Sequence, residues 1–467
     1  MQSSFTRLHA PIIFLNHSNI CRLFPQRTAS QSLRSRVFDS RCTASTSSPD
    51  AVGIELSEHT PRRGSCYGCG AALQTEEAAA PGYVSVEKYE EKRRHRQLGT
   101  LVCRRCQDLS NGAMVPGVAD VWGRDSEEDL KVLVSPEQLR TQLARVREER
   151  AVAVLLVDLL DASGSFLSRV RDLIGKNPVF LVGTKVDLLP KGTNTEEVAQ
   201  WLERSAAQKR LSPIATFLVS SRTREGIAQV AKAVRIERRG RDVYIMGSAN
   251  VGKSAFVRCA ECQIIVLEPA IGIAGHLPVE SAMPGTTLQL IALNTFEAGG
   301  TLFDTPGVHL QHRLQHLLEP ALTKQLLPKG KLKPFLPPSP QELAFQAQLG
   351  TSSPTSYFWG GLVRIDIVDA PVSTSLAFYG PRTMRVTSSP LLDDSSDHLS
   401  AVSAKSADVT LNLSGAGPVA DVAVSGLPGW VAIRTEQNGG RLVLRVWAPA
   451  GIEAYVRPPL PVPQIVK

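Results

Sequence analysis

The segment GSANVGKS, residues 247–254, constrains this chain more than any other feature. An apolar run, RDVYIM, precedes it and a helical run, AFVRCAEC, follows it, as the pattern G-x-x-x-x-G-K-S/T requires. Its glycines let backbone N–H groups surround phosphate oxygens at the start of a helix. The segment predicts a phosphate-binding loop in which Lys253 meets the β- and γ-phosphates and Ser254 meets Mg²⁺. The residues expected to bind the phosphates are Gly247, Ser248, Ala249, Asn250, Val251, Gly252, Lys253 and Ser254.

Two later segments extend this predicted site. In TLFDTPG, Asp304 ends an apolar strand, where a carboxylate holds Mg²⁺ through water, and Gly307 offers a backbone N–H to the γ-phosphate. In MPGTTLQL, Thr287 is the expected switch residue at Mg²⁺. The magnesium residues are therefore predicted to be Ser254, Thr287 and Asp304. The catalytic set is predicted to be Lys253, Asn250, Thr287 and Gly307.

A base-reading segment stands before the phosphate loop. PVFLVGTKVDLLP places Thr184, Lys185 and Asp187 at the end of a strand. The Asp187 carboxylate can accept both N–H donors on the Watson–Crick edge of guanine, which adenine does not offer, while Lys185 can stack on the base. TFLVSSRTREGI adds Ser220 and Ser221, whose backbone can contact the guanine carbonyl. GTP is the predicted nucleotide, and the motif order is that of a GTP-binding set cut open and rejoined.

The pattern of apolar residues divides the chain into five ranges. Strand-like and helical runs alternate from about 130 to 310, which predicts a mostly parallel sheet covered on both faces. The expected fold is α/β: a permuted P-loop domain with a cysteine module before it and a β-rich domain after it. The expected boundaries are 1–60 for a leader and linker, 61–112 for the cysteine module, 113–327 for the P-loop domain, 328–361 for a Pro- and Ser-rich linker, and 362–467 for the β-rich domain. The longest apolar run, 151–160, is far shorter than a membrane span of about 20 residues.

Two C-x-x-C pairs predict a zinc site. Cys66 and Cys69 precede Cys103 and Cys106 with 33 residues between the pairs, and four thiolates suit tetrahedral structural Zn²⁺. The intervening loop is longer than the usual about 15–20 residues, but loop closure costs little beside zinc binding. Redox-active or free thiols are the alternative. The basic run EKRRHR, with Arg104, Arg105 and the tyrosines of this module, favours either RNA binding or a solvated charged face.

The first 41 residues account for most of the net charge. They hold six arginines and one acidic residue, so they supply +5 of the total +8. An Arg- and Ser-rich, acid-poor beginning is typical of an organelle transit peptide. Composition does not decide between a plastid and a mitochondrion.

These motifs together resemble the YqeH-type circularly permuted GTPases, in their plant and algal plastid branch. The resemblance covers about residues 60–310 and is carried by YGCGA, LLDASGS, GTKVDLLPKGT, GRDVYIMGSANVGKSAF, PGTTL and DTPGVHLQHR. A weaker match follows in VSGLPGWVAI and RPPLP. The resemblance implies GTP hydrolysis coupled to maturation of the small ribosomal subunit, with binding to organellar ribosomal RNA or a small-subunit precursor. The plastid branch implies a chloroplast location, with the mitochondrion as the alternative. The oligomeric state is left open.

Two positions depart from common GTPases. Thr184 stands where the base motif usually has Asn, and Val308 stands where Ras-like enzymes carry a water-positioning Gln. In related GTPases with this hydrophobic substitution, an Asn in the phosphate loop helps to hold K⁺. Asn250 occupies that place here, and a turn-stabilising Asn is the alternative. Slow hydrolysis that a ribosomal partner raises is expected. His309, His312 and His316 are expected on an exposed switch helix rather than at a metal.

Two other functions remain open. One is a non-catalytic RNA scaffold whose GTPase fold only binds nucleotide. The other is a redox sensor based on thiols or zinc.

Overall fold

The computed structural model describes residues 64–110, 141–267 and 287–463. The short gaps within these ranges are residues 79, 288, 294, 297–298, 309, 311, 319, 341, 343–353, 372, 392–403, 414 and 437–438. The predicted leader, residues 113–140 of the predicted P-loop domain and His309 lie outside the described residues. Among the helices of the described ranges, none is long and apolar enough to cross a membrane.

A six-stranded sheet carries the nucleotide motifs, in the order β3-β2-β1-β4-β6-β5. All neighbouring pairs are parallel except β5, which runs antiparallel to β6. The strands are β1 (Ala151–Asp158), β2 (Val179–Thr184), β3 (Ala215–Val219), β4 (Asp242–Gly247), β5 (Ile291–Leu293) and β6 (Leu302–Asp304). The carboxyl ends of the parallel strands lie at one edge, so motifs far apart in the chain meet there.

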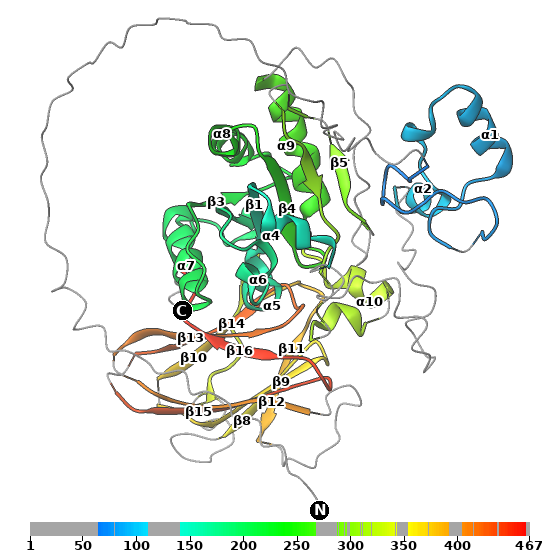
Figure 1. Ribbon diagram of the computed structural model, residues 1–467. Coiled ribbons are helices and arrows are strands. Elements are labelled where there is room, and N and C mark those ends of the chain that lie inside the picture. Colours follow the sequence, from blue (N-terminus) through cyan, green and yellow to red (C-terminus); the bar gives the residue numbers. More distant parts are fainter. Residues whose placement is uncertain are drawn as a thin grey trace, which may run out of the picture. The chain divides into compact units, whose positions relative to one another are not determined.

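Helices cover both faces of this sheet, as the continuous apolar runs predict (Figure 1). Every residue of β1 is buried, and its alternate side chains enter two different cores. One core contains side chains of α8 and α9, and the other contains side chains of α4, α6 and α7. The helices of this region are α4 (Ala144–Glu148), α5 (Ala162–Ser165), α6 (Val170–Ile174), α7 (Thr195–Gln208), α8 (Ile227–Arg238), α9 (Lys253–Leu267) and α10 (Pro320–Gln325). Its single-turn 3-10 helices are η3 (Leu159–Asp161), η4 (Val186–Leu188) and η5 (Leu314–His316).

The C-terminal part forms two five-stranded antiparallel sheets that share an apolar core. Their orders are β16-β13-β14-β10-β7 and β11-β8-β9-β15-β12. The strands are β7 (Pro334–Phe335), β8 (Thr355–Trp359), β9 (Val363–Asp369), β10 (Thr374–Tyr379), β11 (Val386–Pro390), β12 (Ala404–Asn412), β13 (Gly417–Val424), β14 (Trp430–Thr435), β15 (Arg441–Ala448) and β16 (Ala454–Arg457).

These sheets correct the predicted linker at 328–361. Strands β7 and β8 lie in that range and pair with β10, β9 and β11. Leu332 is buried, and its N–H donates to the carbonyl of Leu188 at 2.8 Å. This range is rich in Pro and Ser, but Pro is compatible with strand ends and edges, so the composition does not exclude strands. One apolar core also joins Trp430 and Leu460 to the P-loop sheet, so the C-terminal sheets do not pack as an independent body.

The cysteine module contains α1 (Val86–Arg94), η1 (Leu98–Thr100) and α2 (Arg104–Ser110). Its small core consists of the four cysteines with Ala71, Val84, Leu101 and Leu109. A core of this size is weak without a covalent or metal cross-link.

Candidate functional site

The phosphate loop leaves β4 and enters α9, as its sequence predicts. Asn250 has a left-handed φ of 63°, a conformation that Asn tolerates better than most residues. The Lys253 ammonium donates to the carbonyl of Ser248 at 2.8 Å, inside the turn where phosphates would sit. Burial lowers the pKa of Lys253 to about 8, and the nearby Asp304 carboxylate opposes that shift. The loop therefore presents a buried cation that an anionic ligand would stabilise.

The three predicted magnesium residues meet at one point. The Ser254 hydroxyl lies 3.2 Å from the Asp304 carboxylate and 3.2 Å from the Thr287 hydroxyl. Thr287 in turn donates to Asp304 at 3.4 Å. The second oxygen of Asp304, Oδ1, is buried without a hydrogen-bond partner in the described part of the chain. An unpaired buried carboxylate oxygen beside two hydroxyls fits a hard cation such as Mg²⁺.

Burial also acts on the Asp304 carboxyl itself. It raises the pKa of this group to about 6, while Lys253 lowers it. Two desolvated opposite charges therefore lie within one site, each made less stable by burial and more stable by the other.

Gly307 and Val308 lie directly against the phosphate loop. A Cβ on Gly307 would stand 2.8 Å from the Ala249 Cα and 3.0 Å from the Lys253 ammonium, so only glycine fits. Val308 exchanges backbone hydrogen bonds with the loop: its N–H donates to Gly247 and its carbonyl accepts from Ala249. The Val308 side chain is buried in the apolar core. It can neither reach nor orient an attacking water.

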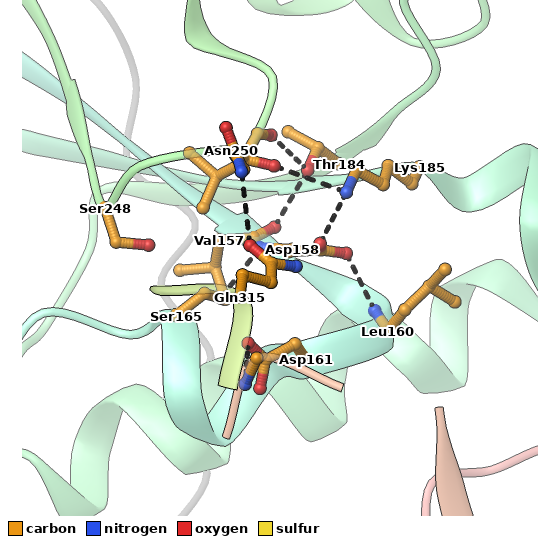
Figure 2. Close-up of polar contacts among 12 residues, drawn as sticks. Val157, Asp158, Leu160, Asp161, Ser165, Thr184, Lys185, Ser248, Asn250 and Gln315 are labelled. Atoms are coloured by element: carbon orange, nitrogen blue, oxygen red, sulfur yellow. Dashed lines mark hydrogen bonds and ion pairs between the residues drawn. The ribbon is translucent and has the colours of Figure 1, made fainter. Parts of the chain in front are cut away.

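The base-reading segment is tied to the phosphate loop through its first two residues (Figure 2). The Thr184 hydroxyl, where Asn is usual, donates to the Val251 carbonyl at 2.8 Å. Lys185 pairs with Asp158 at 2.6 Å and donates to the Asn250 carbonyl at 3.3 Å. Threonine therefore retains a direct tie between the two loops, and Asp158 at the end of β1 fixes the lysine.

The other predicted base contacts lie at the same sheet edge. Asp187 is half-buried in η4, directly after β2. Ser220 is fully buried after β3, where its hydroxyl accepts from the N–H of Thr223 at 3.0 Å. The carbonyl of Ser221 accepts from the Cys259 thiol at 3.3 Å, which joins this loop to α9. The structure thus gathers every predicted nucleotide residue along one edge.

A buried ion pair beneath the phosphate loop was not predicted from the sequence. Arg313 is fully buried and pairs with Asp161 at 2.9 Å. Its guanidinium also donates to the Ala249 carbonyl and to the Ser248 hydroxyl, the latter at 3.3 Å. Asp161 lies within the LLDASGS motif, but nothing in the sequence indicates a partner 152 residues away.

The same segment corrects the expected exposed switch helix. Its ordered turn, η5, is a single 3-10 turn in which Leu314 and Gln315 are buried. The Asn250 amide donates to Gln315 at 3.2 Å, so this segment packs on the phosphate loop (Figure 2). The spacing of His309, His312 and His316 predicts a solvated helix, but this spacing carries no information on the residues between them, of which Leu314 and Gln315 are buried.

The four cysteines form a compact buried cluster. Their sulfurs all lie within 4.8 Å of one another, with Cys66 and Cys106 at 3.8 Å and Cys69 and Cys103 at 4.0 Å. Sulfurs bound tetrahedrally to one Zn²⁺ at about 2.3 Å would lie about 3.8 Å apart. Hydrogen bonds with Cys103 raise the pKa values of the Cys69 and Cys106 thiols, and a bound cation would oppose this shift because it favours thiolates. The cluster is compatible with Zn²⁺.

The cations of this module differ in exposure. Arg93, Arg94 and Arg96, at and just after the end of α1, are exposed. Arg104, the first residue of α2, is also exposed. Arg105 is buried, and Tyr67 and Tyr89 pack against apolar cores. Of the arginines predicted to face RNA or solvent, Arg105 is therefore not at the surface, whereas Arg93, Arg94 and Arg96 are.

Comparisons with known proteins identify three informative relatives, although no family model matches the chain. It is 39% identical to a protein of Oryza sativa subsp. japonica named "Putative nitric oxide synthase", over 86% of this chain and 78% of that protein. It is 37% identical to NO-associated protein 1, chloroplastic/mitochondrial, of Arabidopsis thaliana, over 85% and 76%. It is 29% identical to YqeH of Bacillus subtilis, over 84% of this chain and 98% of that protein.

The sheet order and the gathered motifs define the class. This is a GTP-binding P-loop fold whose base-reading strands precede the phosphate loop in the chain, which is a circular permutation. The chain belongs to the YqeH-type family of circularly permuted GTPases, in the branch that holds the plant proteins.

Proposed function

We propose that this chain hydrolyses GTP and acts as an assembly factor for the small ribosomal subunit of an organelle. The observation that carries the enzymatic part is the convergence of Ser254, Thr287 and Asp304 beside Lys253. One Asp304 oxygen there is buried and has no hydrogen-bond partner among the described residues. Mg²⁺ bound there would neutralise charge on the β- and γ-phosphates. Gly307 lies close enough to the loop for its N–H to donate to the γ-phosphate, so a bound nucleotide would hold this segment in place.

Substitution of Lys253 tests nucleotide binding directly. We expect Lys253→Ala to abolish GTP and GDP binding in calorimetry, because the loop loses its only buried ammonium among the described residues. The fold should persist, because the Lys253 side chain contacts the phosphate loop and is not part of an apolar core. Val86→Ala on the exposed side of α1 is a matched control and should bind as the unchanged chain does. Unaltered affinity of Lys253→Ala would refute the assignment of the phosphate loop.

Potassium is the proposed extra cation for hydrolysis. Val308 is buried and cannot position water, so charge on the transferred phosphoryl group must be met by other groups. The Asn250 side-chain nitrogen donates to Gln315, and we propose that the side-chain oxygen Oδ1 faces a cation at the phosphates. We expect turnover in K⁺ to exceed that in Na⁺, and Asn250→Ala to erase the difference while GTP affinity stays nearly unchanged.

The K⁺ comparison requires single-turnover rates with and without ribosomal subunits, because a partner could supply its own cation. Loss of one such electrostatic contact typically lowers the rate by about 10²–10³. Equal rates in K⁺ and Na⁺ under both conditions would contradict the K⁺ proposal. Absence of hydrolysis under every condition, with GTP bound, would favour the scaffold function instead.

The ribosomal and organellar part rests on family and surface charge. The Arabidopsis relative is named chloroplastic/mitochondrial, and we propose a chloroplast location for this chain, with the mitochondrion as the alternative. Two exposed basic groups could meet an RNA backbone: the arginines at the end of α1, and Lys329, Lys331 and Lys333. Ribosomal RNA or a small-subunit precursor is the proposed partner.

Crosslinking in the organelle, followed by sequencing of the bound RNA, tests this partner. We expect small-subunit ribosomal RNA, and less of it when Arg93 and Arg94 are both replaced by Glu. Arg204→Glu on α7, a charge reversal at an exposed site elsewhere on the chain, is the control and should crosslink normally. Recovery of unrelated RNA, or of equal amounts from all variants, would refute the proposed surface.

A further inference from the structure

The buried pair of Arg313 and Asp161 connects the phosphate loop to the C-terminal sheets. On the loop side, Arg313 Nη1 donates to the carbonyl of Ala249 and to the hydroxyl of Ser248. On the other side, Nε and Nη2 both donate to Asp161 Oδ2, at 3.2 and 2.9 Å. The Arg313 guanidinium therefore connects the phosphate loop to the Asp161 carboxylate, which lies outside the loop.

Asp161 is fixed in turn by the turn between β13 and β14. The same Oδ2 accepts the N–H of Gly426 at 2.9 Å. The carbonyl of Ser425 accepts the N–H of Leu314, next to Arg313, at 2.8 Å. The planar guanidinium is held at both ends, by one carboxylate oxygen and by the phosphate loop, so it cannot rotate without breaking several hydrogen bonds.

Two glycines show that the contact between the Asp161 segment and the Ser425–Gly426 turn is closely packed. A Cβ on Gly164 would stand 2.4 Å from Ser425 Oγ and 2.5 Å from Asp161 Oδ1. A Cβ on Gly426 would stand 2.5 Å from the backbone nitrogen of Leu314. Close-packed elements of this kind move together or not at all.

We propose that Arg313 is a positioning residue for nucleotide binding: it holds the phosphate loop in its binding geometry, and Asp161 with the Ser425–Gly426 turn holds Arg313. The inference rests on the proposed binding of GTP and extends it to the C-terminal sheets. These sheets thereby become part of the nucleotide site without touching the nucleotide. A change at the loop on binding or hydrolysis reaches the turn through two side chains.

The test is a double-mutant cycle in the full chain, with GDP and Mg²⁺ as the probe in calorimetry. Arg313→Lys keeps the charge but cannot reach the loop and Asp161 together. Asp161→Asn removes the charge of a group that does not touch the loop. We expect each to raise the GDP dissociation constant about 10-fold or more, and the double variant to raise it no further than the worse single variant.

Asp366→Asn separates positioning from general stability. Asp366 is equally buried in β9 and pairs with Arg364 at 2.7 Å, so its loss should lower the melting temperature comparably. It should leave GDP affinity unchanged. Normal affinity of Arg313→Lys, or effects of the two substitutions that multiply in the double variant, would overturn the proposal.

Gly164→Ala keeps the test decisive if the charge variants fold poorly. Its methyl group would push Asp161 and Ser425 apart without altering any charge, and GDP affinity should fall several-fold. Gly330→Ala, where a Cβ meets nothing within 4 Å, is its control. Equal affinity of these two variants would overturn the proposal. If the unchanged chain binds GDP while Arg313 proves dispensable, only this inference fails; if the unchanged chain binds none, the proposed function fails with it.

Discussion

At the scale of single residues, we propose that guanine selection depends on Asp187 and that nucleotide affinity depends partly on Thr184. Asp187 follows β2 at the edge where the base would lie, whereas Thr184 points into the structure and bonds the phosphate loop. The first residue would touch the ligand and the second would only hold the loops together. Substitutions at the two positions should therefore have different signatures.

We expect Asp187→Asn to weaken GTP and to admit xanthosine triphosphate, because an amide can donate to the carbonyl that xanthine carries in place of the guanine amino group. Thr184→Val should weaken both nucleotides about 3- to 10-fold, the effect of one lost hydrogen bond, without changing the preference. Competition binding with the two nucleotides measures both effects. An unchanged preference in Asp187→Asn would mean that this residue does not read the base.

The site residues that can be predicted from the sequence are those that belong to a short motif. The phosphate loop, the Asp187 segment and the Asp304 segment each contain their own signature within a few positions. No local pattern assigns a role to Asp158 or Asp161, because their partners Lys185 and Arg313 are brought to them only by the fold. Long-range ion pairs leave no local pattern in a single sequence.

At the scale of elements, the cysteine module is the part whose fold should depend on a metal. Its core is small, and four buried thiols within 4.8 Å of one another form the centre of that core. Zinc binding contributes about 10–16 kcal/mol in small domains of this kind, far more than the apolar contacts of such a module.

We expect one zinc per chain, lost when Cys103 and Cys106 are both replaced by Ser, since hydroxyls ionise much less readily than thiols. Residues 64–110 should then unfold while the P-loop sheet, with its own cores, remains folded. Elemental analysis and limited proteolysis check the two parts. A Cys259→Ser variant, whose thiol lies on α9, should retain its zinc. An unchanged chain that carries no metal and titrates reversibly with oxidant would support the redox alternative.

At the scale of the whole molecule, a second contact between the C-terminal sheets and the P-loop region forms around the buried pair of Asp421 and Arg457. Asp421 on β13 accepts the N–H of Leu460 at 2.9 Å and lies 3.8 Å from Arg457. The Arg457 guanidinium lies over the ring of Trp201 in α7, 5.0 Å from its centre. The Trp201 indole donates to the carbonyl of Pro458 at 3.1 Å. This second contact, here called the joint, is therefore a buried Asp–Arg pair flanked by an aromatic side chain of the P-loop region.

This joint should make stability depend on pH. Burial raises the pKa of Asp421 to about 7, although Arg457 lowers it. The folded chain then holds a proton that the unfolded chain has released above about pH 4, so this group's contribution to stability is complete below pH 4 and is lost as the pH rises through 7. Between pH 5 and 7, Asp421→Asn should lessen the fall in unfolding free energy by up to about 1.4 kcal/mol per pH unit. Urea unfolding at pH 5, 6, 7 and 8 measures the slopes, with the half-exposed Asp369→Asn as a control that should parallel the unchanged chain. If Asp421→Asn also runs parallel to it across this range, then Asp421 is already ionised in the folded protein and the joint works as an ordinary ion pair.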